Sequence, residues 1–276
     1  MIKKIGILLL IAIGANAQDK GQFETYSNPF YGTIISESNK YENEEKEASK
    51  SFKMNFDGKQ IPKSLEEFTI VEAENPISQG NTGTCWCFST TSFYESEIHR
   101  ITGKTINLSE LYPVYFEYIE KARGYINSRG KTHLGEGSET NAVQRMMDWY
   151  GIVPAEAYEG KPSDQPYYNH EKMFGEIETY LKNCKKTNFW DEDAILSNVK
   201  SILNHYMGAP PTSFKYNGET YTPKSFLKNV TKLKSNDYVD FMSLMQKPYW
   251  SQEEYKVPDN WWRSDAYYNV PLSDFM

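Results

Sequence analysis

The chain has 276 residues, of which 39% are hydrophobic and 15% aromatic, and it carries a net charge of −7 at neutral pH. This composition is enough to fill a core, so disorder along the whole chain is excluded. The acidic balance provides no basic face, so we expect no nucleic-acid partner. The excess acid is concentrated between Glu37 and Glu47, where solvation is the usual role of such a run.

The first residues have the three-part plan of a secretory signal peptide. Two lysines precede an apolar run over residues 5–13, and Ala-Asn-Ala follows at 15–17. The apolar run is shorter than the ~20 residues that span a bilayer, which argues against an uncleaved anchor. We therefore expect residues 1–17 to be removed after Ala17, leaving an exported protein, periplasmic or secreted, without a membrane anchor.

The next stretch, residues 18–63, is polar, lacks apolar periodicity and is interrupted by Gly and Pro. These features predict an extended leader. The folded domain is then expected over residues 64–276.

Helical patterns dominate the first part of this domain. A helix is predicted over 84–102, with Trp86 and Phe93 on one face and Gly103 as its end. A second helix is expected after Ser109, whose hydroxyl suits a cap. The glycine-rich stretch 124–138 predicts a loop, and a third helix should begin at Ser138 and end at Gly151.

The remaining elements are a helical pair and two strands. The pair is expected over 170–206, with a break near 188–191, and two prolines follow it at 210–211. Strands are predicted around 239–244 and 267–270 from their apolar and aromatic residues. No internal repeat is visible.

The segment 79–89, QGNTGTCWCFS, carries the chemistry. Cys85 is placed where a helix should begin, and the N–H groups of a helix start lower a thiol pKa and favour a nucleophilic thiolate. When sulfur attacks a carbonyl, negative charge develops on the oxygen. Gln79 in the preceding turn can donate to that oxygen together with the Cys85 backbone N–H. The segment therefore predicts a cysteine nucleophile with its oxyanion donor.

This segment resembles the papain-like cysteine peptidases at seven positions: Gln79, Gly80, Gly83, Cys85, Trp86, Phe88 and Ser89. Thr82 departs from the pattern, because many relatives have a disulfide-forming Cys there. That departure points to the bleomycin hydrolase branch, also called aminopeptidase C. Further segments are similar to that branch in the same order, namely 108–122, 137–154, 203–216, 222–226, 237–244 and 268–272.

The resemblance implies an α+β papain-like fold: an N-terminal helical lobe with a helical insertion, and only the start of the β lobe. It also implies a thiol peptidase, with aminopeptidase action favoured, that works through an acyl-thioester on Cys85. Gly137 and Ser138 match a Gly-Gly pair that backs the substrate main chain, and Trp86 shields the thiolate at the substrate cleft. Peptides are the expected partners, homo-oligomers are a further implication, and no cofactor is expected.

The catalytic base is the difficulty, since a cysteine peptidase needs a His oriented by an Asn or Asp. His99 lies about 21 Å along the helix from Cys85, at 1.5 Å per residue. His133 and His170 lie in polar loops that no strand follows. His205 precedes Gly-Ala-Pro-Pro rather than a strand with Asn-Ser-Trp. The catalytic His and Asn are therefore expected to be absent from this chain, which would stop inside the second half of the fold.

This chain is therefore expected to be inactive as a peptidase unless it is a truncated sequence or another chain supplies the missing residues. Two alternatives to the peptidase stay open. The first is a catalytically silent protein that keeps the peptide cleft but has lost the second lobe. A truncated sequence would instead leave the peptidase intact in the longer protein, whereas a genuine end of the chain here would favour the silent protein. The second is a redox or metal protein using Cys85 and Cys87, although zinc sites usually take four ligands at wider spacings. We expect no metal, a small buried role for Cys87 and a structural role for Cys184.

Overall fold

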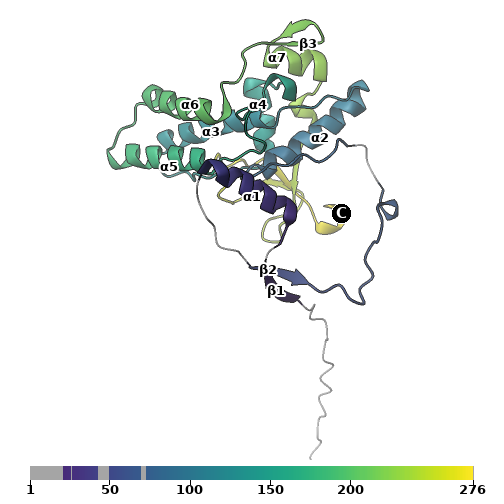
Figure 1. The fold of residues 1–276 in the computed structure, drawn as a ribbon. Coiled ribbons are helices and arrows are strands. Elements are labelled where there is room, and N and C mark those ends of the chain that lie inside the picture. Colours follow the sequence, from purple (N-terminus) through teal and green to yellow (C-terminus); the bar gives the residue numbers. More distant parts are fainter. Residues whose placement is uncertain (1–20, 26, 43–49, 70–72, 276) are drawn as a thin grey trace, which may run out of the picture.

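The computed structural model describes residues 21–25, 27–42, 50–69 and 73–275, so the signal peptide expected over 1–17 lies outside the described residues. Five helices form the body of the molecule (Figure 1). They are α2 (Cys85–Thr102), α3 (Leu111–Asn127), α4 (Thr140–Tyr150), α5 (Glu171–Lys186) and α6 (Glu192–Met207). Helix α3 lies at their centre and contacts α2, α4 and α6.

The core surrounds α3, which is buried on nearly every side. Its fully buried side chains include Leu111, Val114, Tyr118 and Ala122. Burying one large apolar side chain stabilises a fold by about 1.5–3 kcal/mol, so a helix buried all round has a large share in holding the body together.

Local signals at the helix ends behave mostly as predicted. Gly103 has a left-handed φ of 67° and donates its N–H to the His99 carbonyl at 2.8 Å, which ends α2. The Ser109 hydroxyl accepts the Tyr112 N–H at 3.1 Å and caps the first turn of α3. The prediction that Ser138 caps α4 is wrong: Glu139 precedes that helix, and no side chain caps it.

The predicted helical insertion is confirmed as α5 and α6, which contact each other. The break falls at 187–191, where Asn188 takes a positive φ of 54°. Asp191 then caps α6 by accepting the Ala194 N–H at 3.0 Å. Within the described part of the chain, no helix is long and apolar enough to cross a membrane.

Beyond α6 the chain turns to short strands. A hairpin joins β3 (Phe214–Tyr216) to β4 (Glu219–Tyr221), and α7 (Pro223–Phe226) follows. A three-stranded sheet has the order β5-β7-β6, in which β7 is parallel to β5 and antiparallel to β6. Its members are β5 (Asp240–Met242), β6 (Ser251–Glu253) and β7 (Tyr267–Asn269), and α8 (Leu272–Phe275) comes next.

The strands predicted around 239–244 and 267–270 are thus confirmed as β5 and β7. Short irregular helices complete the element order: η1 (Leu65–Glu67), η2 (Ala155–Ala157), η3 (Leu227–Thr231) and η4 (Ser235–Asp237). The helical body followed by short strands is the mixed α+β fold that was expected.

The described part of the predicted leader is not simply extended, and this corrects the expectation for 18–63. It contains β1 (Gly21–Thr25) paired antiparallel with β2 (Lys50–Met54), and helix α1 (Pro29–Glu42) between them. The physical reason lies in the start and the face of α1. Asn28 accepts the Tyr31 N–H at 3.0 Å, Pro29 suits a first helical position, and Ile34 is buried.

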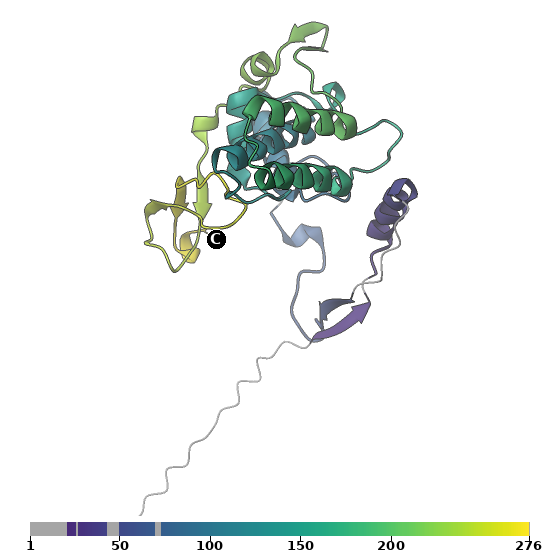
Figure 2. The same cartoon turned by 90° about the vertical axis from the view of Figure 1, so that its left-hand side faces the viewer.

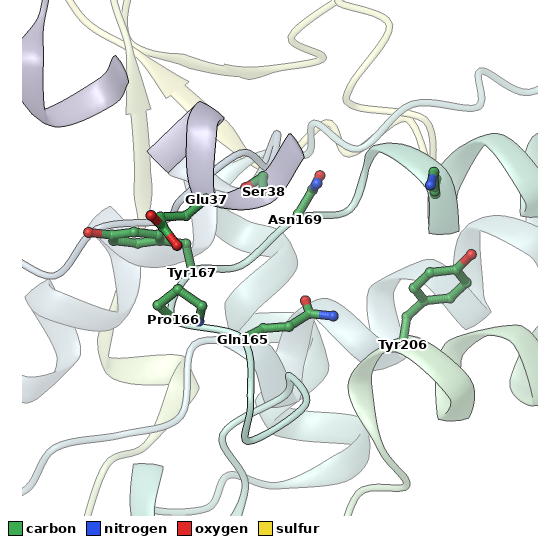
Figure 3. Close-up of a pocket in the computed structure, with 8 residues that line it drawn as sticks. Glu37, Ser38, Gln165, Pro166, Tyr167, Asn169 and Tyr206 are labelled. Atoms are coloured by element: carbon green, nitrogen blue, oxygen red, sulfur yellow. The ribbon is translucent and has the colours of Figure 1, made fainter. Parts of the chain in front are cut away.

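Helix α1 lies against the segment that precedes α5 (Figure 3). The rings of Phe30 and Tyr167 meet edge to face with centroids 6.3 Å apart. A pocket of about 200 Å³ remains beside this contact, lined by Glu37, Ser38, Gln165, Pro166, Tyr167, Asn169, Lys172 and Tyr206. In Figure 2, α1 and the C-terminal sheet lie on opposite sides of the view, with the helical body above them.

Candidate active site

The candidate nucleophile stands at the beginning of a helix. Cys85 is the first residue of α2 and its side chain is exposed. Thr84 precedes it as the N-cap residue and makes no side-chain cap hydrogen bond. The first N–H groups of a helix have no partners within it and carry partial positive charge. A thiolate at Cys85 is therefore favoured by the position of the residue in the fold.

The turn before Cys85 is held by its own polar side chains. The Thr82 hydroxyl donates to the Gln79 carbonyl at 2.9 Å and also lies 2.5 Å from the Thr84 hydroxyl. Gln79 donates one amide hydrogen to the Thr82 carbonyl. A primary amide has two such hydrogens, so one is left to stabilise an oxyanion. Thr82 thus ties together the loop in which Gln79 lies.

A second segment packs against this turn. The Asn81 N–H donates to the Tyr168 carbonyl at 2.8 Å, and the His170 N–H donates to the Asn81 carbonyl at 3.2 Å. Gly80 has a φ of +65°, and a Cβ there would lie 2.3 Å from the Tyr168 oxygen. Only glycine fits at this close approach. The turn is therefore fixed to the segment that leads into α5.

We call residues 79–84 the nucleophile loop and residues 135–138 the substrate loop. Glu136 joins the two, because its carboxylate accepts the Gly83 N–H at 2.7 Å and its carbonyl accepts the Trp86 indole N–H at 3.2 Å. Burial raises the pKa of the Glu136 carboxyl, and the bond from Gly83 opposes that rise. A cavity of about 520 Å³ lies between the nucleophile loop and α1.

The two sequence-predicted residues of the substrate loop have different surroundings. Ser138 is buried, and its hydroxyl donates to the Glu117 carboxylate at 2.8 Å. Its side chain therefore faces the core, which also explains why it does not cap α4. Gly137 lies beside Asp259, since a Cβ on Gly137 would lie 2.8 Å from the nearer carboxylate oxygen. Trp86 is buried beneath the loop at 5% exposure.

Charged side chains inside the body support the substrate loop, and the sequence analysis missed them. Lys121 donates to the carbonyls of Gly135 and Gly137, while Glu117 pairs with Arg145. Burial lowers the pKa of Lys121, and the Glu117 carboxylate opposes this shift. One available signal was the pair Glu117 and Lys121, two charged residues four positions apart in a helix rich in tyrosine and aliphatic residues.

His170 is a buried histidine that contacts both loops, since its backbone N–H donates to the Asn81 carbonyl and its ring lies near Glu136. Its Nδ1 lies 3.2 Å from the Tyr118 hydroxyl and 4.0 Å from the Glu136 carboxylate. The ring is almost fully buried, and burial lowers its pKa to about 3. His170 is therefore neutral near pH 7 and does not provide an imidazolium for a thiolate.

The other histidines lie elsewhere. His99 and His205 belong to the last turns of α2 and α6, and His133 faces Asp259 at 3.9 Å. Within the described residues, none of the four donates a hydrogen bond to, or accepts one from, Cys85. The structure thus places Gln79 in the loop that leads to Cys85, with its amide bonded to the Thr82 carbonyl, and none of the histidines among the described residues is bonded to Cys85.

Cys87 is buried, as predicted, and Cys184 is buried as well. The Cys87 thiol donates to the Glu110 carbonyl at 3.1 Å, and burial raises its pKa well above the usual value. Cys85 and Cys87 lie about 200° apart around the helix axis, so their sulfurs point in different directions. The described residues contain no group of three or more His, Cys, Asp and Glu that could hold a metal ion. This geometry disfavours a shared redox or metal site.

An exposed cysteine at a helix start, an amide in the preceding turn and a helical lobe leading into a small sheet define the class: a papain-like fold with a cysteine at the position of the candidate nucleophile. Comparison with known families then identifies the family. The model of the papain family cysteine proteases matches residues 61–251. The chain belongs to that family.

Two relatives give the extent of the likeness. The Germination-specific cysteine protease 1 of Arabidopsis thaliana is 26% identical over 136 residues, which are 43% of this chain and 35% of the plant protein. The crystal structure of PepW from Lactobacillus rhamnosis HN001 (DR20) superposes with a TM-score of 0.59 at 19% identity, covering 71% of this chain and 53% of that chain. The chain thus spans about a third and about half of the lengths of these two proteins.

Proposed function

We propose that the protein is a thiol-dependent peptidase that hydrolyses peptide bonds through an acyl-thioester on Cys85. The observation that carries this proposal is the exposure of Cys85 at the start of α2, six residues after Gln79, while Cys87 and Cys184 are buried. Sulfur attacks the peptide carbonyl carbon, and Gln79 and the Cys85 N–H stabilise the oxyanion. The C–N bond breaks, the amine leaves with a proton, and water then hydrolyses the thioester.

The finer assignment is an aminopeptidase of the bleomycin hydrolase branch, exported by residues 1–17 and acting on peptides. Support for the branch comes from Thr82, which stands where many papain relatives have a disulfide-forming cysteine. Its hydroxyl closes the nucleophile loop by hydrogen bonds instead. Support for export comes from the charged, apolar and small-residue segments at the start of the sequence.

A catalytically silent peptide-binding protein is the second candidate. The observation that favours it is the absence of a hydrogen bond between Cys85 and any histidine of the described residues, together with the buried, neutral state of His170. Such a protein would keep the cleft and the exposed thiol, but no imidazolium would hold the thiolate.

The pH profile of iodoacetamide labelling separates the two candidates. A free thiol has a pKa of ~8.5, whereas a peptidase thiolate forms well below pH 7. We expect fast labelling of Cys85 between pH 5 and 7, followed by mass spectrometry of the peptide that contains it. The buried thiols of Cys87 and Cys184 serve as internal controls, and Cys85→Ala should abolish the fast phase. Slow, flat labelling below pH 7 would reject the peptidase and favour the silent protein.

Cleavage assays address the finer assignment. Peptides with a free amino terminus and the same peptides with an acetylated amino terminus are incubated with the wild-type protein and with Cys85→Ala. An aminopeptidase releases the first residue from the free peptides only. Cleavage of both sets at internal bonds would show an endopeptidase instead.

A further inference from the structure

Glu136 contacts the chain on both sides of the candidate nucleophile. Its carboxylate accepts the N–H of Gly83, two residues before Cys85, and its carbonyl accepts the indole N–H of Trp86, the next residue after Cys85. The two partners lie 53 and 50 positions away in the sequence. A single residue of the substrate loop thus spans the turn that carries the thiol.

The contact between the loops is close and well shielded. A Cβ on Gly83 would lie 2.7 Å from the Glu136 Cβ, so only glycine lets the two backbones approach this far. The Glu136 side chain is 22% exposed. A charge-assisted hydrogen bond to a backbone N–H is stronger than a neutral one, and more so away from water.

The other side of the substrate loop is held from within the core. Lys121 of α3 is 2% exposed, and its ammonium donates to the carbonyls of Gly135 and Gly137, one on each side of Glu136. The backbone of Glu136 is therefore anchored to the most buried helix of the molecule. Through its carboxylate, which accepts the Gly83 N–H, Glu136 also fixes the nucleophile loop to this anchored segment.

We propose that Glu136 is a positioning residue, which fixes the nucleophile loop against the substrate loop and so sets the direction of the oxyanion donors at Gln79 and Cys85. The inference rests on the proposed function for its consequence in catalysis. The hydrogen bond to Gly83 itself is independent of that function. We expect that loss of the Glu136 carboxylate makes the positions of the Gln79 amide and the Cys85 N–H less fixed. The reactivity of the Cys85 thiol toward alkylation should not change.

Hydrogen exchange tests the contact directly. Glu136→Ala removes the acceptor, so the Gly83 amide should exchange about tenfold faster, because a lost hydrogen bond leaves that N–H open to water. The Asn81 amide, bonded to the Tyr168 carbonyl, is the internal reference and should keep its rate. Glu139→Ala is the matched control, because Glu139 is an acidic residue of the adjoining segment whose side chain makes no hydrogen bond to the nucleophile loop among the described residues. Unchanged exchange at Gly83 in Glu136→Ala would overturn the proposal.

A peptide aldehyde tests the consequence at the site. The Cys85 sulfur adds to its carbonyl carbon, and the oxyanion donors stabilise the oxygen that results. Iodoacetamide reacts differently, because the sulfur displaces iodide from carbon and no oxyanion forms. We expect Glu136→Ala to weaken aldehyde binding about tenfold and to change the iodoacetamide rate less than about twofold. Glu136→Gln keeps an acceptor oxygen and should restore aldehyde binding to within about threefold of the wild-type value.

The outcomes separate this inference from the proposed function. If wild-type protein binds no aldehyde, the peptidase proposal fails, and exchange at Gly83 alone decides whether Glu136 holds the loop. If wild-type and Glu136→Ala bind aldehyde equally well, the positioning role is wrong even though the peptidase proposal survives. Thermal unfolding of each variant is the control for a general loss of structure. If Glu136→Ala does not fold, Glu136→Gln is used for the same measurements.

Discussion

Glu95 is an acidic residue in the middle of α2, the helix that begins with Cys85, and is only 5% exposed. Its carboxylate accepts the Leu108 N–H at 2.7 Å, and so links α2 to the segment before α3. Burial raises the pKa of Glu95 to about 7, an effect that the bond from Leu108 opposes and the Glu110 carboxylate reinforces. The residue therefore changes charge near neutral pH.

The stability of the protein should accordingly depend on pH through Glu95. The folded pKa of about 7 lies above the unfolded value of 4.5, so between these values the folded state binds more protons. The contribution is fully present below pH 4.5 and is lost as the pH rises through 7, by at most about 3 kcal/mol. Urea unfolding at pH 5, 6, 7 and 8 should show this fall in wild-type protein and a shallower fall in Glu95→Gln.

A matched control lies on the same helix. The Arg100 guanidinium beside Glu97 lowers the pKa of that carboxyl, so Glu97→Gln should leave the slope between pH 5 and 8 unchanged. Equal slopes for wild-type protein and Glu95→Gln would show that another group titrates.

At the scale of elements, one asparagine of β7 holds the small sheet together. Asn269 is fully buried, and its amide nitrogen contacts the carbonyls of Leu244, Lys247 and Pro248 at 2.9–3.0 Å. Its side-chain oxygen accepts the Leu244 N–H at 2.8 Å. The turn after β5 is therefore closed by the side chain of the strand beside it.

Replacing this side chain should weaken the sheet. Asn269→Ala would leave several buried backbone groups without partners, each of which costs about 1–3 kcal/mol. We expect the free energy of unfolding to fall by about 3 kcal/mol, measured by urea unfolding followed by tryptophan fluorescence. Gln252→Ala, at an exposed position of β6, is the control and should stay near the wild-type value. A loss below about 0.5 kcal/mol for Asn269→Ala would contradict this role.

The elements also show what the sequence could reveal. The ends of α2 and α4 were predictable because Gly103 and Gly151 are local signals, and β5 and β7 followed from short apolar runs. Helix α1 was missed because its described part buries little apolar surface beyond Ile34, which leaves a weak periodic pattern. Its start, Asn28-Pro29, was a signal that went unused.

The site was only partly predictable, for a similar reason. Gln79 and Cys85 lie within one short segment, so their relation can be read from spacing. The contact of Glu136 with Gly83 joins loops 53 positions apart, and only the folded chain brings them together. The polar side chain of Ser138 could face either the cleft or the core. It faces the core because its hydroxyl donates a hydrogen bond to the buried Glu117 carboxylate.

Over the whole molecule, the described part of α1 buries little apolar surface against the helical body. Ile34 is buried, whereas Ser36, two residues further on, is exposed. The pair β1–β2 lies away from the helical body in both views of the ribbon (Figures 1 and 2). Elements with few buried contacts open at a lower free energy than the core does.

This difference predicts a local effect of one substitution. Ile34→Asp would place a charge in an apolar contact, so α1 should leave the body while α2–α6 stay folded. We expect limited proteolysis within residues 29–42 to be about tenfold faster, with little change in the main melting transition. Ser36→Asp, on the exposed face, is the control. Equal cleavage of the two variants would mean that Ile34 does not hold α1.

The strand order β5-β7-β6 also governs when the sheet can be built. During synthesis on the ribosome, β5 and β6 emerge before the strand that separates them, so neither has its partner until Tyr267–Asn269 have been added. The contacts among α2–α6 need no residue beyond Met207, so this body can assemble while the strands wait. A chain in which β7 has not yet paired presents the unpaired edges of β5 and β6, with Phe241 exposed, to chaperones or to other chains.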